Sequence, residues 1–235
     1  MTYQEIIARL HELAQPDKVA YKEKKFGVVS QNALGVYMKD IKELAKEIPK
    51  DDDLALRLFD SNIYEARLLC SKLFSPKALT DELAEKWVVT FDNWEICDSF
   101  SMGIFARSPF ALPLINKWAS RTAEFEKRAA FATMAAYCMA DKKAGNEVFL
   151  NFLPMIEAAA DDERNFVKKA VNWALRGIGK RNIDLNQEAI ACAKRILRQD
   201  NKAARWIASN ALKELEKEGV RISDYPRNIY RKGEL

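Results

Sequence analysis

The sequence predicts an all-α protein, and three observations support this: its composition, the spacing of its apolar residues and a segment that recurs along the chain. Apolar residues make up 49% of the 235 residues and charged residues 31%, with only 8 Gly and 7 Pro. This composition is typical of a folded, helix-rich chain rather than a disordered one. The length suits one large domain or one continuous array of repeats.

Apolar residues recur at helical spacing from the first residues onward, and strand-like alternation is almost absent. The first apolar stripe consists of Ile6, Ile7, Leu10 and Leu13. Later stripes include Leu54, Leu58, Ala66, Leu69 and Leu73. Breaks are expected at short polar or proline-bearing joints, which in chain order are Pro16-Asp17, Pro49 to Asp52, Ser75-Pro76, Ser108-Pro109, Lys142 to Gly145 and Asn182 to Asp184. These joints predict about a dozen helices of ordinary length.

A short segment repeats in the second half of the chain. Residues 125–130 and 166–171 share an aromatic residue, two intervening positions, a basic residue and a small residue, 41 positions apart, and residues 202–206 form a weaker third copy. Spacings near 40 indicate HEAT-like helix pairs, which stack into a curved solenoid with one helix of each pair on the concave face. We therefore expect an α-α superhelix with a concave basic face, forming a single domain over residues 1–235 with a basic C-terminal tail at 221–235.

Cysteine and histidine usage argues against a metal or disulfide framework. The four cysteines, Cys70, Cys97, Cys138 and Cys192, are widely spaced in apolar runs, and His11 is the only histidine. We expect four reduced core thiols, no metal site and no cofactor. The first residues resemble no secretory leader and no apolar run is long enough to span a membrane, so we expect a cytoplasmic protein.

Positive charge is concentrated in one stretch of the chain. Between Arg164 and Lys213 there are 12 basic and three acidic residues, so this stretch is +9, whereas the whole chain is only +4. Lys169, Trp173, Arg176 and Lys180 share one face at helical spacing, with Asp161 to Glu163 before them as a candidate N-terminal cap. Clustered cations with interleaved aromatics indicate a polyanion site, although a solvated outer face with Trp173 in the core is the competing interpretation.

A second candidate site lies near residue 94. The segment 91–98 reads as a helix start with Asp92 as N-cap and Glu95 in a capping box, which places Trp94 and Asp98 four residues apart on one face. A fixed carboxylate beside an aromatic plate suits cleavage of a glycosidic bond, because it can stabilise the positive charge that develops on the sugar. The alternative is a core Trp94 with Asp98 paired to an arginine. Packing roles are expected for Trp87, Trp118 and Trp206.

The chain resembles the AlkD-like DNA alkylation repair family, bacterial HEAT-repeat DNA glycosylases, over nearly its whole length. The resemblance rests most specifically on residues 162–176, DERNFVKKAVNWALR, and is supported by 34–36, 41–48, 62–67 and 91–98. It implies excision of alkylated purines, chiefly cationic N3- and N7-alkyl adducts, from duplex DNA.

The resemblance also implies roles for individual residues. The family's catalytic aspartate corresponds to Asp98, its tryptophans to Trp94 and Trp173, and its arginines to Arg128 and Arg176. Together with the basic stretch, the expected DNA-binding residues are Arg128, Lys168, Lys169, Arg176, Lys180 and Arg181. The family also uses an aromatic residue near its N-terminus, for which Tyr21, Phe26 and Tyr37 are unmatched candidates.

Two other functions compete with base excision. The same face could bind distorted or branched DNA without catalysis, in which case Asp98 would be dispensable and Arg176 would not. A HEAT scaffold for an acidic protein is the third possibility and offers no reason for an aspartate and two tryptophans at these positions. We expect a monomer that works on double-stranded DNA, associated with the bacterial nucleoid when bound, and no contact with membranes.

Overall fold

The computed structural model describes residues 1–230, and these are helical throughout, with no strand among them. Fourteen α-helices are present in this part of the chain, together with two short 3₁₀ segments, η1 (Pro76–Ala78) and η2 (Phe105–Arg107). The all-α prediction is confirmed. The helices form two compact units, Met1–Phe110 and Ala111–Leu235.

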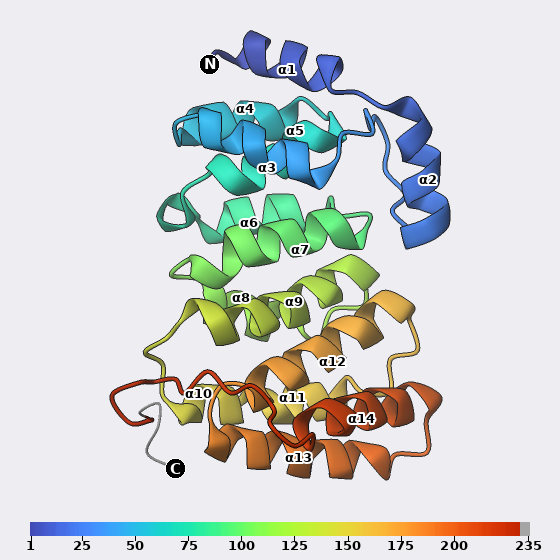
Figure 1. Cartoon of the computed structure of the whole chain (residues 1–235), viewed down its shortest axis with the longest axis vertical. Helices are drawn as coiled ribbons and strands as arrows, with labels where there is room; N and C mark the ends of the chain where they lie inside the picture. Colours follow the sequence, from blue (N-terminus) through green and yellow to red (C-terminus); the bar gives the residue numbers. More distant parts are fainter. Residues whose placement is uncertain (231–235) are drawn as a thin grey trace. The chain divides into compact units, whose positions relative to one another are not determined.

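The first unit contains seven α-helices (Figure 1). They are α1 (Tyr3–Glu12), α2 (Pro16–Phe26), α3 (Met38–Glu47), α4 (Asp52–Asp60), α5 (Tyr64–Leu73), α6 (Asp81–Val88) and α7 (Trp94–Gly103). The breaks expected at Pro16, 49–52 and 75–76 coincide with helix boundaries, since α2 starts at Pro16, α4 starts at Asp52 and residues 75–76 follow α5. Helix α5 is the centre of the unit, because nearly all of its residues are buried and it packs against α1, α3, α4 and α7.

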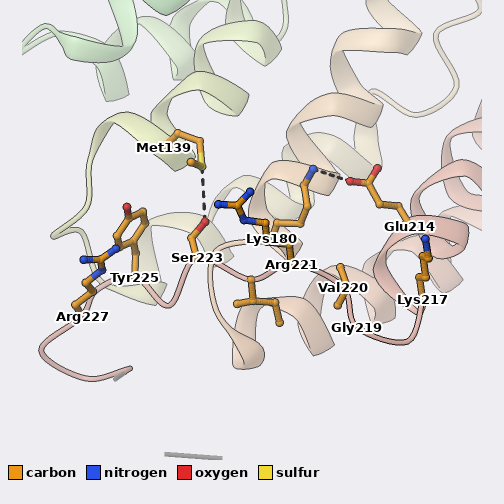
Figure 2. Close-up of a pocket in the computed structure, with 11 residues that line it drawn as sticks. Met139, Lys180, Glu214, Lys217, Gly219, Val220, Arg221, Ser223, Tyr225 and Arg227 are labelled. Carbon is orange, nitrogen blue, oxygen red and sulfur yellow. Dashed lines mark hydrogen bonds and ion pairs between the residues drawn. The ribbon is translucent and has the colours of Figure 1, made fainter. Parts of the chain in front are cut away.

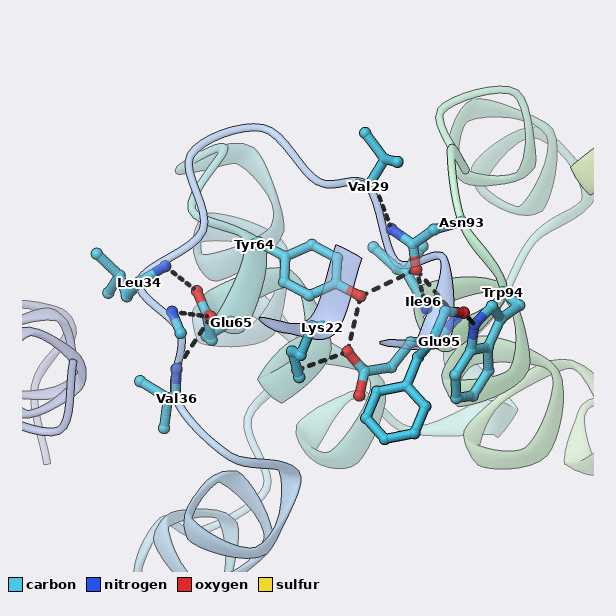
Figure 3. Close-up of polar contacts among 12 residues, drawn as sticks. Lys22, Val29, Leu34, Val36, Tyr64, Glu65, Asn93, Trp94, Glu95 and Ile96 are labelled. Carbon is cyan, nitrogen blue, oxygen red and sulfur yellow. Dashed lines mark hydrogen bonds and ion pairs between the residues drawn. The ribbon is translucent and has the colours of Figure 1, made fainter. Parts of the chain in front are cut away.

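A buried carboxylate fixes the connection between α2 and α3. Glu65, on α5, is fully buried and accepts hydrogen bonds from the backbone N–H groups of Leu34, Gly35 and Val36 at 2.9, 2.8 and 3.2 Å (Figure 3). A loop that carries unpaired buried N–H groups would be costly, and a charged acceptor satisfies three of them at once. The segment between Gly27 and Tyr37 is therefore held against α5 and delivers Tyr37 to a defined place.

The second unit contains the other seven α-helices. They are α8 (Ala111–Trp118), α9 (Glu124–Ala140), α10 (Asn146–Leu150), α11 (Phe152–Ala158), α12 (Asn165–Gly179), α13 (Ile183–Leu197) and α14 (Lys202–Leu215). The predicted repeat is visible here, because the three recurring segments start α9, α12 and α14, and α12 packs against both of the others. Phe125 and Phe166, the matching aromatics, stack with ring centroids 5.5 Å apart.

Apolar burial follows the sequence prediction at the cysteines and at two tryptophans. All four cysteines are buried thiols outside any disulfide, and burial raises the pKa of both Cys138 and Cys192 to about 12. Such thiols are poor nucleophiles. Trp87 and Trp118 are fully buried, as expected, whereas Trp206 is 39% exposed, so its predicted packing role is wrong.

The end of the chain is less regular. Residues 221–230 of the expected basic tail have no helix or strand, and residues 231–235 of that tail lie outside the described part of the chain. Whether the two units act as one domain stays a prediction. None of the helices in residues 1–230 is long and apolar enough to cross a membrane.

Candidate functional site

The Trp94–Asp98 pair lies at the start of α7, as predicted. The helix begins one residue later than expected, however: Asn93 is the N-cap and accepts from the N–H groups of Glu95 and Ile96, whereas Asp92 was predicted for this role. Asparagine and aspartate cap equally well, which is why two adjacent candidates could not be separated from sequence. Trp94 is then the first helical residue, and Asp98 follows one turn later; both are half-buried.

The indole of Trp94 has a fixed position. Its Nε1–H donates to the carbonyl oxygen of Phe26, the last residue of α2, at 2.9 Å. Gly27 follows Phe26 in the left-handed conformation and ends the helix there. The C-terminus of α2 therefore anchors the ring beside the helix that bears Asp98.

A cavity of about 640 Å³ opens beside this tryptophan. Its walls come from α2, from the start of α3 and from α7, and it is lined by Lys18, Tyr21, Lys22, Phe26, Val28, Tyr37, Met38, Trp94 and Glu95. All three N-terminal aromatics that the sequence left unassigned thus meet in one place. Their gathering depends on the fold of residues 27–37, for which spacing along the chain gives no signal.

Two of the lining residues form an ion pair that the sequence did not predict. Lys22 Nζ lies 2.8 Å from Glu95 Oε2, and the Tyr64 hydroxyl donates to the same oxygen at 3.0 Å (Figure 3). Both charged side chains are only 12% exposed. Burial, and then the neighbouring Glu95, raises the pKa of Tyr64 well above its usual range, so this phenol stays protonated. Glu95 was expected to serve only as a cap.

Helix α12 in the second unit carries the predicted basic face. Lys169 is exposed, Trp173 and Arg176 are half-buried, and Lys180 is the C-cap that directly follows the helix. Arg176 and Lys180 both pair with Glu214 of α14, Lys180 at 2.6 Å. The carboxylate lies just outside the basic stretch counted from sequence, so part of the charge of this face is neutralised within the protein.

Lys180 also borders a cavity of about 580 Å³ at the C-terminal end of α12 (Figure 2). The chain after α14 forms its other side and contributes three more cations, Lys217, Arg221 and Arg227. Glu214 is the one carboxylate among the residues that line it. Part of the expected basic tail therefore lies next to the basic helix.

Lys168 has a different partner. Its Nζ lies 5.3 Å from the ring centre of Trp206 on α14, a cation–π arrangement at the surface. Trp206 was assigned to packing, yet it is an exposed aromatic next to the basic helix. The weak third copy of the repeat was the signal that could have placed it here, because α14 stands beside α12 as α12 stands beside α9.

Arg181 is a correction to the predicted DNA contacts. Its side chain is 1% exposed and donates to the carbonyl oxygens of Cys138 and Ala144 at 2.7 and 2.8 Å, with the guanidinium 4.0 Å from the Phe149 ring centre. Burial lowers its pKa. An arginine so enclosed ties α9, α10 and α12 together and does not reach a phosphate. Arg128 is 6% exposed and donates to the Phe166 carbonyl, so its predicted phosphate contact stays a prediction.

The acidic residues before α12 also differ from expectation. The N-cap of α12 is Arg164, without a side-chain capping bond, and Asp162 instead accepts from Arg164 and from Lys127 on α9. Arg164 first, and then Lys127, hold the pKa of Asp162 at about 2. Within residues 1–230 there is no group of three or more metal-ligating side chains.

The predicted site residues thus fall into two groups. Trp94 and Asp98 belong to the first unit, and Arg128, Lys168, Lys169, Trp173, Arg176 and Lys180 to the second. Trp94 and Asp98 share one helix, and the second group gathers on α9 and α12 with α14 beside them.

Comparisons with known proteins bear on the family and on the fold of the chain. The family model described as DNA alkylation repair enzyme matches residues 6–215. A solved structure described as a new family of proteins related to the HEAT-like repeat DNA glycosylases, with affinity for branched DNA structures, is 18% identical. The alignment covers 94% of this chain and 97% of that one, with a TM-score of 0.75. A designed armadillo repeat protein is 14% identical over 75% of this chain and 92% of its own, with a TM-score of 0.35.

No curated protein matches the sequence. The likeness to the first solved structure shows that the fold is HEAT-like, as the repeat spacing predicted. The family match spans most of the chain, including both groups of predicted site residues. The chain therefore belongs to the DNA alkylation repair enzyme family.

Proposed function

We propose that this protein is a DNA glycosylase that hydrolyses the N-glycosidic bond of N3- or N7-alkylated purines in duplex DNA. The observation that carries the proposal is the Trp94–Asp98 pair, one turn apart on α7, with the indole held by the Phe26 carbonyl. A preorganised aromatic ring next to a carboxylate can hold a sugar and stabilise positive charge on it.

The reaction suits a site in which Asp98 is the acting carboxylate, Glu95 is held by Lys22 and Tyr64, and no histidine takes part. An alkylated purine already bears a positive charge, so it leaves as a neutral base when the bond to C1′ breaks and takes the bonding electrons with it. Water adds its oxygen to C1′ and its proton passes to solvent. Asp98 would stabilise the sugar cation electrostatically and orient the water, and strong acid catalysis of the leaving group is not needed.

The second unit offers the groups that would bind the DNA backbone. Lys169 is exposed on α12, Lys168 stands beside the exposed Trp206, and Arg176 and Lys180 share Glu214. Phosphate binding by these cations is independent of sequence and releases counterions, so it should weaken steeply as salt rises. Trp173 lies between them in the sequence of the same helix and is the further tryptophan that the family resemblance assigns to catalysis.

Release of 7-methylguanine and 3-methyladenine from methylated duplex DNA tests the proposal. The wild type should release free base, and Asp98→Asn should be slower by about a hundredfold, the usual loss when one electrostatic stabiliser is removed. Asp53→Asn is the matched control, because it removes an exposed carboxylate of the same unit, on α4. Absence of base release by the folded wild type would refute excision.

Binding of branched DNA without excision is the second candidate. It is favoured by the solved neighbour, which is described as having affinity for branched DNA structures. It predicts tighter binding of a four-way junction than of a linear duplex, no released base at any enzyme concentration, and unchanged binding by Asp98→Asn. The same set of measurements therefore separates the two functions.

A further inference from the structure

Exposed aromatic side chains gather at one cavity of the first unit. Among residues 1–230, four aromatic residues are exposed by 39% or more, and three of them, Tyr21, Phe26 and Tyr37, line the 640 Å³ cavity beside Trp94. The fourth, Trp206, belongs to the second unit. Leaving apolar surface in water is unfavourable, and a cluster of such side chains in a hollow marks a binding surface.

The aromatic walls are fixed. Tyr21 and Phe26 are in edge contact, with centroids 5.9 Å apart and planes at 84°. The Phe26 carbonyl holds the Trp94 indole, and Tyr37 follows the loop that Glu65 fixes. Rings that stay in place without a ligand lose little conformational entropy when a flat molecule inserts between them.

Charge adds a second requirement for the occupant. Two cations, Lys18 and Lys22, and one carboxylate, Glu95, line the cavity. Glu95 pairs with Lys22, so Lys18 is the lining cation that can contact a ligand. The partner of Lys18 is Asp17, whose side chain is 71% exposed, and a surface pair of this kind contributes little and exchanges readily.

We propose that this cavity receives a single unpaired base of a DNA strand, stacked on its aromatic walls, with the adjoining phosphate at Lys18. Planar rings stack with any base through their π faces, and a cation at the rim suits the backbone. A purely apolar ligand would have no use for Lys18. A metabolite with several phosphates would find, besides the Lys22–Glu95 pair, only Lys18 with its exposed partner Asp17. The inference rests on the DNA binding in the proposed function; the cavity shares Trp94 with the proposed excision site, whereas Asp98 does not line it.

Three labelled duplexes of the same sequence test the base itself. One is fully paired, one has a single unpaired adenine, and one has an unpaired abasic nucleotide at the same place. The two interrupted duplexes are similarly flexible, so a preference between them reports the base and not the bend. Binding followed by fluorescence anisotropy should be about tenfold tighter for the adenine bulge than for the abasic bulge, as expected for one stacked base.

Variants then locate the effect. Tyr21→Leu and Tyr37→Leu should bring the two bulges to nearly equal affinity and leave binding of the paired duplex unchanged, since both side chains are exposed. Tyr3→Leu, on α1 and outside the cavity, should retain the preference. Lys18→Ala should weaken binding of the adenine bulge more than Lys24→Ala, which removes the same charge from an exposed position on the same helix.

Equal binding of the adenine and abasic bulges by the wild type would overturn the inference, and so would a preference that survives in both tyrosine variants. Base release from methylated duplex in those same preparations would then still support the proposed function. A wild type that binds none of the three duplexes contradicts both.

Discussion

Gly35 stands where the chain cannot accept a side chain. Its φ is +83°, and a Cβ atom there would lie 2.0 Å from the carbonyl oxygen of Gln15. The same turn is closed by the Gln15 N–H, which donates to the Leu34 carbonyl, and by Glu65, which accepts from the Gly35 N–H. The contact is between two backbones, so no rotamer change can relieve it.

Gly35→Ala should therefore lower the free energy of unfolding by about 3 kcal/mol, the sum of left-handed backbone strain and forced displacement of a packed backbone. Gly219→Ala is the control, because Gly219 has a φ of +71° but nothing within 4 Å of the added Cβ. It should cost only about 1 kcal/mol. Urea unfolding of both variants measures the difference, and equal costs would mean that the contact with Gln15 relaxes freely.

Single residues also show where sequence analysis succeeds and fails. Trp94 and Asp98 could be paired from sequence because both lie on one helix, where spacing fixes geometry. The burial of Arg181 could not, since it depends on carbonyls from residues 138 and 144 and on the Phe149 ring, all far away along the chain. Glu95 was misread for the same reason, because its partners Lys22 and Tyr64 come from other helices.

At the scale of elements, Asp162 joins two repeats of the second unit. Its carboxylate pairs with Lys127 of α9 at 3.0 Å and with Arg164, the N-cap of α12, whose guanidinium also donates to the Thr122 carbonyl. The repeat offset was readable from sequence because each helix begins with a similar local pattern. The link between the repeats through Asp162 could not be predicted, because an acidic run before a helix normally indicates an N-terminal cap.

Asp162→Asn should make the protein less stable at pH 7 and less sensitive to acid. The folded-state pKa of Asp162, about 2, lies below the usual aspartate value of 3.8. The stabilisation is therefore present above pH 4 and is lost as the pH falls toward 2. We expect the melting temperature of the variant to be lower by about 3 °C at pH 7 and to approach that of the wild type near pH 2.

Asp161→Asn serves as the control for this measurement, because Asp161 is the exposed neighbour. Its melting temperature should follow the wild type at every pH. A difference between Asp162→Asn and wild type that stayed constant from pH 7 to pH 2 would show that the effect does not come from the charge of the carboxylate.

At the scale of the whole molecule, the charge count overstates the basic surface. The stretch from Arg164 to Lys213 is +9, yet acidic residues just outside it neutralise several of its cations. The pairs are Arg164 with Asp162, Arg176 and Lys180 with Glu214, Lys194 with Glu216, and Arg195 with Glu157. Arg181 is buried as well. In the part of the chain that the structure describes, Lys168 and Lys169 have no such ion pair. They are therefore the cations of α12 whose charge no carboxylate neutralises.

The salt dependence of DNA binding separates these classes of cation. Each phosphate contact makes the negative slope of log K against log salt steeper by nearly one unit. Lys169→Ala should therefore make this slope shallower by about 1 on every duplex sequence. Lys194→Ala removes a cation of α13 that pairs with Glu216, the C-cap of α14, and the slope should stay unchanged. Arg181→Met should reduce the stability of the second unit, because it removes two hydrogen bonds and two cation–π contacts, and should leave the slope of the folded protein as it was. If Arg181→Met made the slope as much shallower as Lys169→Ala, the guanidinium would have to leave its buried place to reach DNA, and the division between structural and DNA-facing cations would not hold.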